Sequence, residues 1–165
     1  MELKKILQTA LEFEKKGHNI YSETAKKSIN PIVKRTFDYL AGQEINHINE
    51  ITEFIKKEKP KIKLKGDRIN ETQNFFNTTV SEFKEKTKLS TDDIKAHETA
   101  LELEQSAFDF YKSQIGKSKD NFADKFFTFL MEQEQAHYNL IQKSYEYIKD
   151  PENFYSDKEG WMFEG

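Results

Sequence analysis

An internal repeat with a period of 90 residues constrains the fold of this chain more than any other feature. Residues 9–21 match residues 99–111 at six of 13 positions, and residues 37–49 match residues 127–139 at six of 13 positions. A solenoid needs three or more copies of its unit. Because only two copies are present, the repeat predicts one closed, pseudo-symmetric domain.

Each copy carries two long segments in which apolar residues recur every three or four positions, as they do in amphipathic helices. We expect helices over about residues 2–28, 30–57, 91–116 and 120–149. Asn30 followed by Pro31 is a typical helix start, and Asp150 followed by Pro151 a typical stop. The pattern predicts an all-α four-helix bundle made of two pseudo-symmetric helix hairpins.

The domain limits follow from these helices. We expect the bundle to occupy residues 1–150, with one long crossover over residues 58–90 that makes the topology up-down-down-up. Helical spacing of Phe76, Val80, Phe83 and Thr87 predicts a short helix lying across the bundle. Residues 151–165 form a tail rich in large apolar side chains, which we expect to pack on the bundle or on a partner subunit.

Each of the four apolar stripes contains a glutamate, and two of the stripes also contain a histidine three residues later. A charged residue inside an inward stripe breaks the pattern that core packing needs and indicates function. The six residues repeat at the 90-residue offset. They are Glu14, Glu44, His47, Glu104, Glu134 and His137.

This set has the composition of a dinuclear carboxylate metal site, with one Glu from each of two helices and Glu-x-x-His from each of the other two. Four buried carboxylates without partners would cost several kcal/mol each, and two divalent cations would neutralise them. A core of paired polar groups without metal is therefore the weaker alternative. Oxygen and imidazole ligands favour iron or manganese.

Spacing also selects among neighbouring residues. Glu14 lies on the apolar stripe of its helix whereas Glu12 does not, and the same argument selects Glu104 over Glu102. Small residues one turn later, Gly17 and Ala107, would leave room for a metal and an oxygen ligand.

Tyr21 and Tyr111 lie on the stripes of Glu14 and Glu104, two turns further on. They are equally well interpreted as hydrogen-bond donors that orient the carboxylates or as plain core residues. We expect His18 at the edge of the core and His97 in solvent.

Composition excludes several function classes. The chain has no Cys, which excludes disulfides, thiolate metal sites and cysteine nucleophiles. Its net charge of −3 disfavours nucleic-acid binding, and the basic run at 56–68 is interpreted as a solvated crossover. No apolar stretch approaches 18 residues, so we expect no membrane span or signal peptide and a cytoplasmic protein.

The repeated Glu-x6-Tyr and Glu-x-x-His motifs resemble those of the ferritin-like diiron proteins, most closely the rubrerythrin-related branch. The resemblance covers all four helices and implies a ferritin-like bundle. It also implies that Glu44 and Glu134 bridge two irons, with Glu14, Glu104, His47 and His137 as terminal ligands.

Three departures from related families are visible. Full rubrerythrins append a rubredoxin domain with four Cys, which this chain lacks. Typical rubrerythrins carry a further Glu, linked to ligand exchange in peroxide reduction, where this chain has Ala107. Bacterioferritins bind haem through a Met where this chain has Ile45, so we expect no haem.

The resemblance implies a non-haem diiron oxidoreductase that reacts with hydrogen peroxide or dioxygen and is re-reduced by an external electron donor. The alternatives are a ferroxidase or iron-binding protein and a metal-stabilised scaffold without catalysis. We expect two iron ions per chain, with manganese or a mixed pair as the alternative, and a homodimer.

Overall fold

A computed structural model describes residues 2–56, 67–82 and 91–150 of the chain. Within these residues all regular structure is helical. The helices are α1 (Leu3–Lys27), α2 (Pro31–Lys56), α3 (Asp67–Glu82), α4 (Thr91–Gln114) and α5 (Asn121–Lys149). The expected basic crossover and aromatic tail lie largely outside the described residues.

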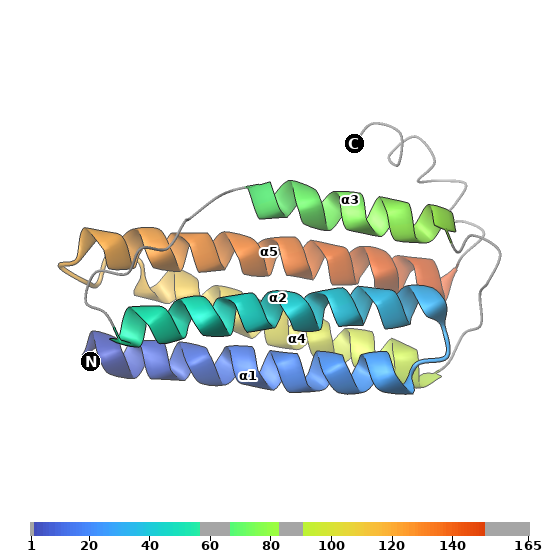
Figure 1. Cartoon of the computed structure of the whole chain (residues 1–165), viewed down its shortest axis with the longest axis horizontal. Coiled ribbons are helices and arrows are strands. Elements are labelled where there is room, and N and C mark those ends of the chain that lie inside the picture. The colour runs from blue at the N-terminus through green and yellow to red at the C-terminus, as the bar shows by residue number, and fades with distance from the viewer. Residues whose placement is uncertain (1, 57–66, 83–90, 151–165) are drawn as a thin grey trace.

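Four long helices form the bundle, which confirms the predicted all-α fold class. The main packing partners are α1 with α2 and α4 with α5, the two hairpins that the repeat predicts. Figure 1 shows α1 and α5 running in one direction along the bundle and α2 and α4 in the other. The hairpins meet along α1 and α4 on one side and along α2 and α5 on the other.

Local capping explains why two of these helices begin where the sequence predicts. The Asn30 side chain accepts hydrogen bonds from the backbone N–H groups of Ile32 and Val33 at 2.9 and 3.2 Å. Asp120 accepts one from Phe122 N at 2.9 Å. Each cap satisfies N–H groups that have no partner within the helix.

The short helix α3 lies lengthwise along the bundle, packed on α5 and α2, and not across it as expected (Figure 1). Its contacts explain the orientation: the ring of Phe75 stacks on Tyr39 at 4.2 Å, and the Tyr39 hydroxyl hydrogen-bonds Thr72. Phe76 is buried and belongs to the apolar core, where it lines a pocket with residues of α5. These contacts hold α3 along α2, and Phe83 and Thr87 lie outside the described residues.

The apolar core is divided into two clusters. One contains Tyr21, Val33 and Phe37 together with residues of α3, α4 and α5. The other contains Leu7, Phe54 and residues of α4 and α5. Along α1 and α2, the carboxylates of Glu14 and Glu44 fall between the two clusters. Each cluster therefore packs one side of a polar layer in the middle of the bundle.

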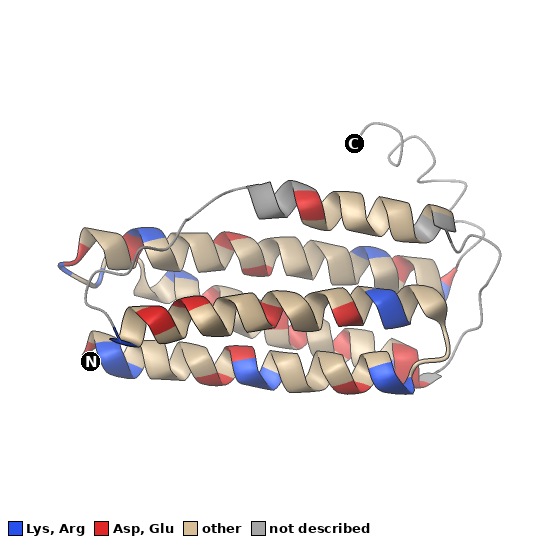
Figure 2. Cartoon of the chain, in the orientation of Figure 1, with Lys and Arg blue, Asp and Glu red and all other residues tan. Residues whose placement is uncertain are grey.

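Charged residues of both signs are interspersed along the long helices (Figure 2). Alternating charge of this kind is typical of the solvent-facing side of an amphipathic helix. None of the helices in the described ranges combines the length and the apolar character of a membrane span.

The expectation that His97 faces solvent is wrong. Its side chain is fully buried, with Nδ1 2.6 Å from the carbonyl oxygen of Asp93 and Nε2 2.7 Å from Ser144 Oγ on α5. The ring meets Phe37 edge-on at 5.0 Å, and the ring of Tyr145 lies 6.1 Å away. Burial lowers the pKa of His97 from 6.5 to about 4, although the hydrogen bond to Asp93 raises it in part.

This burial predicts a loss of stability in acid. The unfolded chain takes up the His97 proton at a higher pH than the folded chain, so the contribution of His97 is complete above about pH 6.5 and is lost as the pH falls towards 4. The full effect is about 3 kcal/mol. In urea unfolding with a chelator present, the stability advantage of the wild type over His97→Gln should shrink by about this amount between pH 7.5 and pH 4. An advantage that is independent of pH would contradict the assignment.

Candidate metal centre

The structure brings the six predicted metal-site residues together in the middle of the bundle. Each is at most 2% exposed. They come from all four long helices, one glutamate from α1 and one from α4, and a Glu-x-x-His pair from α2 and from α5. Glu12 and Glu102, the neighbours that the stripe argument rejected, are exposed.

Contacts within the cluster follow the pseudo-symmetry of the chain. His47 Nδ1 lies 3.2 Å from Glu14 Oε2 and 3.5 Å from Glu134 Oε1. The repeat-related His137 Nδ1 lies 3.3 Å from Glu44 Oε1 and 3.7 Å from Glu104 Oε1. Each histidine thus contacts the glutamate on the other helix of its own hairpin. It also contacts the glutamate of the Glu-x-x-His pair in the other hairpin.

Four of the six residues have the spacing of a metal site. Ligand atoms of Glu44, His47, Glu134 and His137 all lie within 4.8 Å of one another. Glu14 and Glu104 join this group through the contacts with His47 and His137.

Several buried atoms of the cluster have no hydrogen-bond partner, among them Nε2 of both histidines and one carboxylate oxygen each of Glu44, Glu104 and Glu134. Buried polar atoms without partners are costly. A metal pair would use the carboxylate oxygens together with Nδ1 of each histidine, the ring nitrogen that faces the glutamates, and oxygen and imidazole ligands suit iron or manganese. The residues present therefore fit a dinuclear centre.

Electrostatics in the cluster reflect burial and mutual repulsion. Burial and neighbouring carboxylates raise the pKa of Glu44 and Glu104 well above its usual value. The same causes raise the pKa of Glu134 to about 7. Burial also acts to raise the pKa of Glu14, but the adjacent His47 together with hydrogen bonds to Glu44 and Glu134 more than offsets it, and the pKa falls below its ordinary value. The raised pKa values mean that the bare cluster retains protons on some of its carboxylates, because burial and mutual repulsion disfavour their ionised form; divalent cations would replace those protons.

Two tyrosines connect the hairpins at the cluster. The Tyr21 hydroxyl on α1 donates to Glu104 Oε1 on α4 at 2.5 Å, and the Tyr111 hydroxyl on α4 donates to Glu14 Oε1 on α1 at 2.6 Å. Burial and the nearby carboxylates raise the pKa of both phenols, so both remain donors. Of the two interpretations of these tyrosines, this geometry favours the orienting role.

Other side chains near the cluster have structural contacts. His18 is partly buried, and its Nδ1 lies 3.1 Å from the carbonyl oxygen of Ala41, which fits the expected place at the edge of the core. The sequence argument missed Phe13 and Leu103, which line a small cavity beside the carboxylates. The two residues correspond to each other in the 90-residue repeat and directly precede Glu14 and Glu104. This position in the repeat could have predicted that they lie beside the site.

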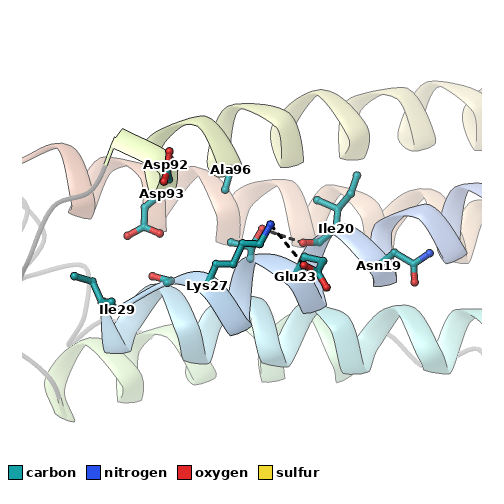
Figure 3. Close-up of a pocket in the computed structure, with 10 residues that line it drawn as sticks. Asn19, Ile20, Glu23, Lys27, Ile29, Asp92, Asp93 and Ala96 are labelled. Carbon is teal, nitrogen blue, oxygen red and sulfur yellow. Dashed lines mark hydrogen bonds and ion pairs between the residues drawn. The ribbon is translucent and has the colours of Figure 1, made fainter.

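Two cavities have very different sizes. The cavity beside the carboxylates measures about 10 Å³. A larger one of about 660 Å³ lies between the end of α1 and the start of α4, and Figure 3 shows its lining residues. Lys27 in its wall is paired with Glu23 at 3.6 Å, and none of the six cluster residues lines it. The chemistry of the cluster therefore belongs to the small cavity.

Comparison with known proteins gives one family. Residues 5–145 match the family model described as Rubrerythrin. The search of curated proteins and the search of solved structures gave no match. The matched range includes all six cluster residues and both tyrosines.

The buried and exposed glutamates on the same helices make a matched test. In a titration with iron(II), the wild type should bind about two ions per chain. Glu14→Ala and Glu104→Ala should lose iron because each removes a carboxylate of the cluster. The control variants Glu12→Ala and Glu102→Ala should bind as the wild type does. If the exposed pair loses iron and the buried pair retains it, the assignment is off by two residues.

Proposed function

The chain belongs to the rubrerythrin family, and on that premise we propose that it is a diiron oxidoreductase that reduces hydrogen peroxide or dioxygen with electrons from an external donor. The observation that carries the proposal is the cluster itself. Four glutamates and two histidines from four helices are buried together, and several of their nitrogen and oxygen atoms have no hydrogen-bond partner. A structural core gains nothing from such an arrangement without cations.

Two bound iron(II) ions would supply one electron each, which with two protons converts one hydrogen peroxide to two molecules of water as its O–O bond breaks. An external donor would have to supply two electrons for each further turnover. The chain has no Cys for a thiol or rubredoxin-type centre of its own. We therefore propose a separate electron-donor protein or small reductant.

The residues of the chain bind, orient and shield the pair. We propose that Glu44 and Glu134 hold both ions, because each lies near the histidine of the other hairpin. The further ligands of one ion would be Glu14 and His47. Those of the other ion would be Glu104 and His137. Tyr21 and Tyr111 would keep the terminal carboxylates oriented by their hydrogen bonds. The apolar clusters on either side keep bulk water out.

A ferroxidase is the second candidate, in which oxidation of iron(II) is itself the purpose. Ala107 favours it, because the resemblance places at this position a glutamate that takes part in peroxide reduction. Ala107 is buried and lines the small cavity beside Glu104. We further propose a cytoplasmic homodimer as the working state of the protein.

The two candidates differ in their response to Ala107→Glu. Residue 107 lies one turn after Glu104, so a carboxylate there would face the cluster. If the peroxidase proposal holds, hydrogen peroxide should oxidise the diferrous wild type faster than dioxygen does. The variant should then speed peroxide turnover with a supplied reductant and leave iron stoichiometry unchanged. Stopped-flow absorption in the near ultraviolet measures both reactions.

Faster reaction of the wild type with dioxygen, together with no gain in the variant, would replace the peroxidase proposal by the ferroxidase. Failure of the wild type to bind iron would contradict both.

A further inference from the structure

The cavity of about 660 Å³ between the end of α1 and the start of α4 lies apart from the metal cluster and has an acidic lining. Its volume falls in the range of sites that hold small molecules. Among the described residues that line it, Glu23, Asp92 and Asp93 are acidic and Lys27 is basic. Lys27 is engaged by Glu23 on its own helix at 3.6 Å. The lining therefore carries an excess of negative charge.

Asp93 is buried at this cavity, and one oxygen of its carboxylate is unsatisfied. The residue is 4% exposed, and Figure 3 shows its carboxylate pointing from α4 towards the end of α1. The hydroxyl of Ser28 hydrogen-bonds this carboxylate, but Oδ2 has no hydrogen-bond partner. A buried acceptor without a partner costs free energy. The unpaired oxygen therefore marks a position where a ligand could donate a hydrogen bond.

The position of Asp93 in the first turn of α4 does not account for this oxygen. A negative charge is favourable at the start of a helix, yet no backbone N–H group reaches Oδ2. Burial raises the pKa of Asp93, the hydrogen bond from Ser28 offsets this only in part, and the charge of Asp92 raises it further. His97 Nδ1 lies 2.6 Å from the carbonyl oxygen of Asp93 and fixes the backbone that carries the carboxylate. Positive charge from a ligand would offset both burial and repulsion.

Apolar side chains share the lining with these acids. They are those of Ile20, Ile29 and Ala96. Ile20 packs against the apolar core, whereas Ile29 is 71% exposed. Such side chains suit a hydrocarbon group and not a bare metal ion. Within the described ranges, metal-ligating side chains converge at the buried Glu-His cluster and not at this cavity. The lining thus combines an unpaired carboxylate oxygen with apolar contact surface.

From these observations we infer that the cavity binds a small organic ammonium ion. Its N–H groups would donate to Asp93 Oδ2, and its hydrocarbon part would contact Ile20, Ala96 and Ile29. An ammonium group offers three hydrogen-bond donors together with the positive charge that the carboxylate lacks, and charge-assisted hydrogen bonds are the stronger ones. The inference goes beyond the proposed function, because the site uses none of the residues of the metal cluster.

The first experiment compares two ligands of nearly the same shape, cyclohexylammonium and neutral cyclohexanol. Backbone amide shifts of the full-length chain, followed by nuclear magnetic resonance, report both the place and the strength of binding. Cyclohexylammonium should shift the amides of Ser28, Ile29 and Ala96 saturably and bind at least tenfold more tightly than cyclohexanol. Equal affinities, or shifts confined to acidic surfaces outside the cavity, would overturn the inference.

The second experiment changes the cavity. Asp93→Asn preserves the shape of the side chain and removes its charge, so cyclohexylammonium should bind at least tenfold more weakly. The matched control is Asp109→Asn, which changes an exposed aspartate of the same helix outside the cavity and should bind as the wild type does. Ala96→Leu fills the cavity without changing charge and should weaken binding at least fivefold.

Ala96→Leu decides the question if Asp93→Asn does not fold. Unchanged binding in Ala96→Leu would overturn the inference. An equal loss in Asp93→Asn and Asp109→Asn would also overturn it, because the ammonium would then be attracted by the overall charge of α4. Iron(II) stoichiometry should equal that of the wild type in all three variants, so failure of this site and failure of the metal centre are distinguishable.

Discussion

The burial of four carboxylates in the middle of an apolar bundle is the constraint on which the rest of this structure depends. Glu14, Glu44, Glu104 and Glu134 are removed from water, and if all four ionise, two histidines alone cannot balance their charge. Charged groups buried without compensation cost several kcal/mol each. The fold tolerates the cluster because two apolar clusters pack on either side of it and because its donor atoms converge where cations can bind.

Pseudo-symmetry determines how the two hairpins meet at this cluster. Each hairpin supplies one tyrosine that hydrogen-bonds the terminal glutamate of the other, through the pairs Tyr21–Glu104 and Tyr111–Glu14. These bonds join α1 to α4, where the packing is sparser than within the hairpins. The polar layer therefore contributes to the assembly of the bundle as well as to its chemistry, and one duplicated unit supplies both halves of the site.

Sequence patterns predicted the features that local physics determines. Helix ends such as those at Asn30 and Asp120 depend on caps within the same segment, and the repeat marked which glutamates lie on inward faces. The burial of His97 was missed because it depends on Ser144, far away on α5. His97 corresponds in the repeat to the buried residue Leu7, and this correspondence could have predicted that His97 is buried. The lengthwise orientation of α3 and the approach of Gly17 to Glu44 also depend on packing between distant segments. Periodicity does not encode such packing.

Anomalous diffraction at the iron edge, from crystals of the protein loaded with iron(II), tests the central claim most directly. The account predicts two anomalous peaks per chain, both between Glu44 and Glu134, with one beside His47 and the other beside His137. A single peak, or peaks outside the buried cluster in protein that has taken up iron, would contradict a dinuclear centre built by the repeat.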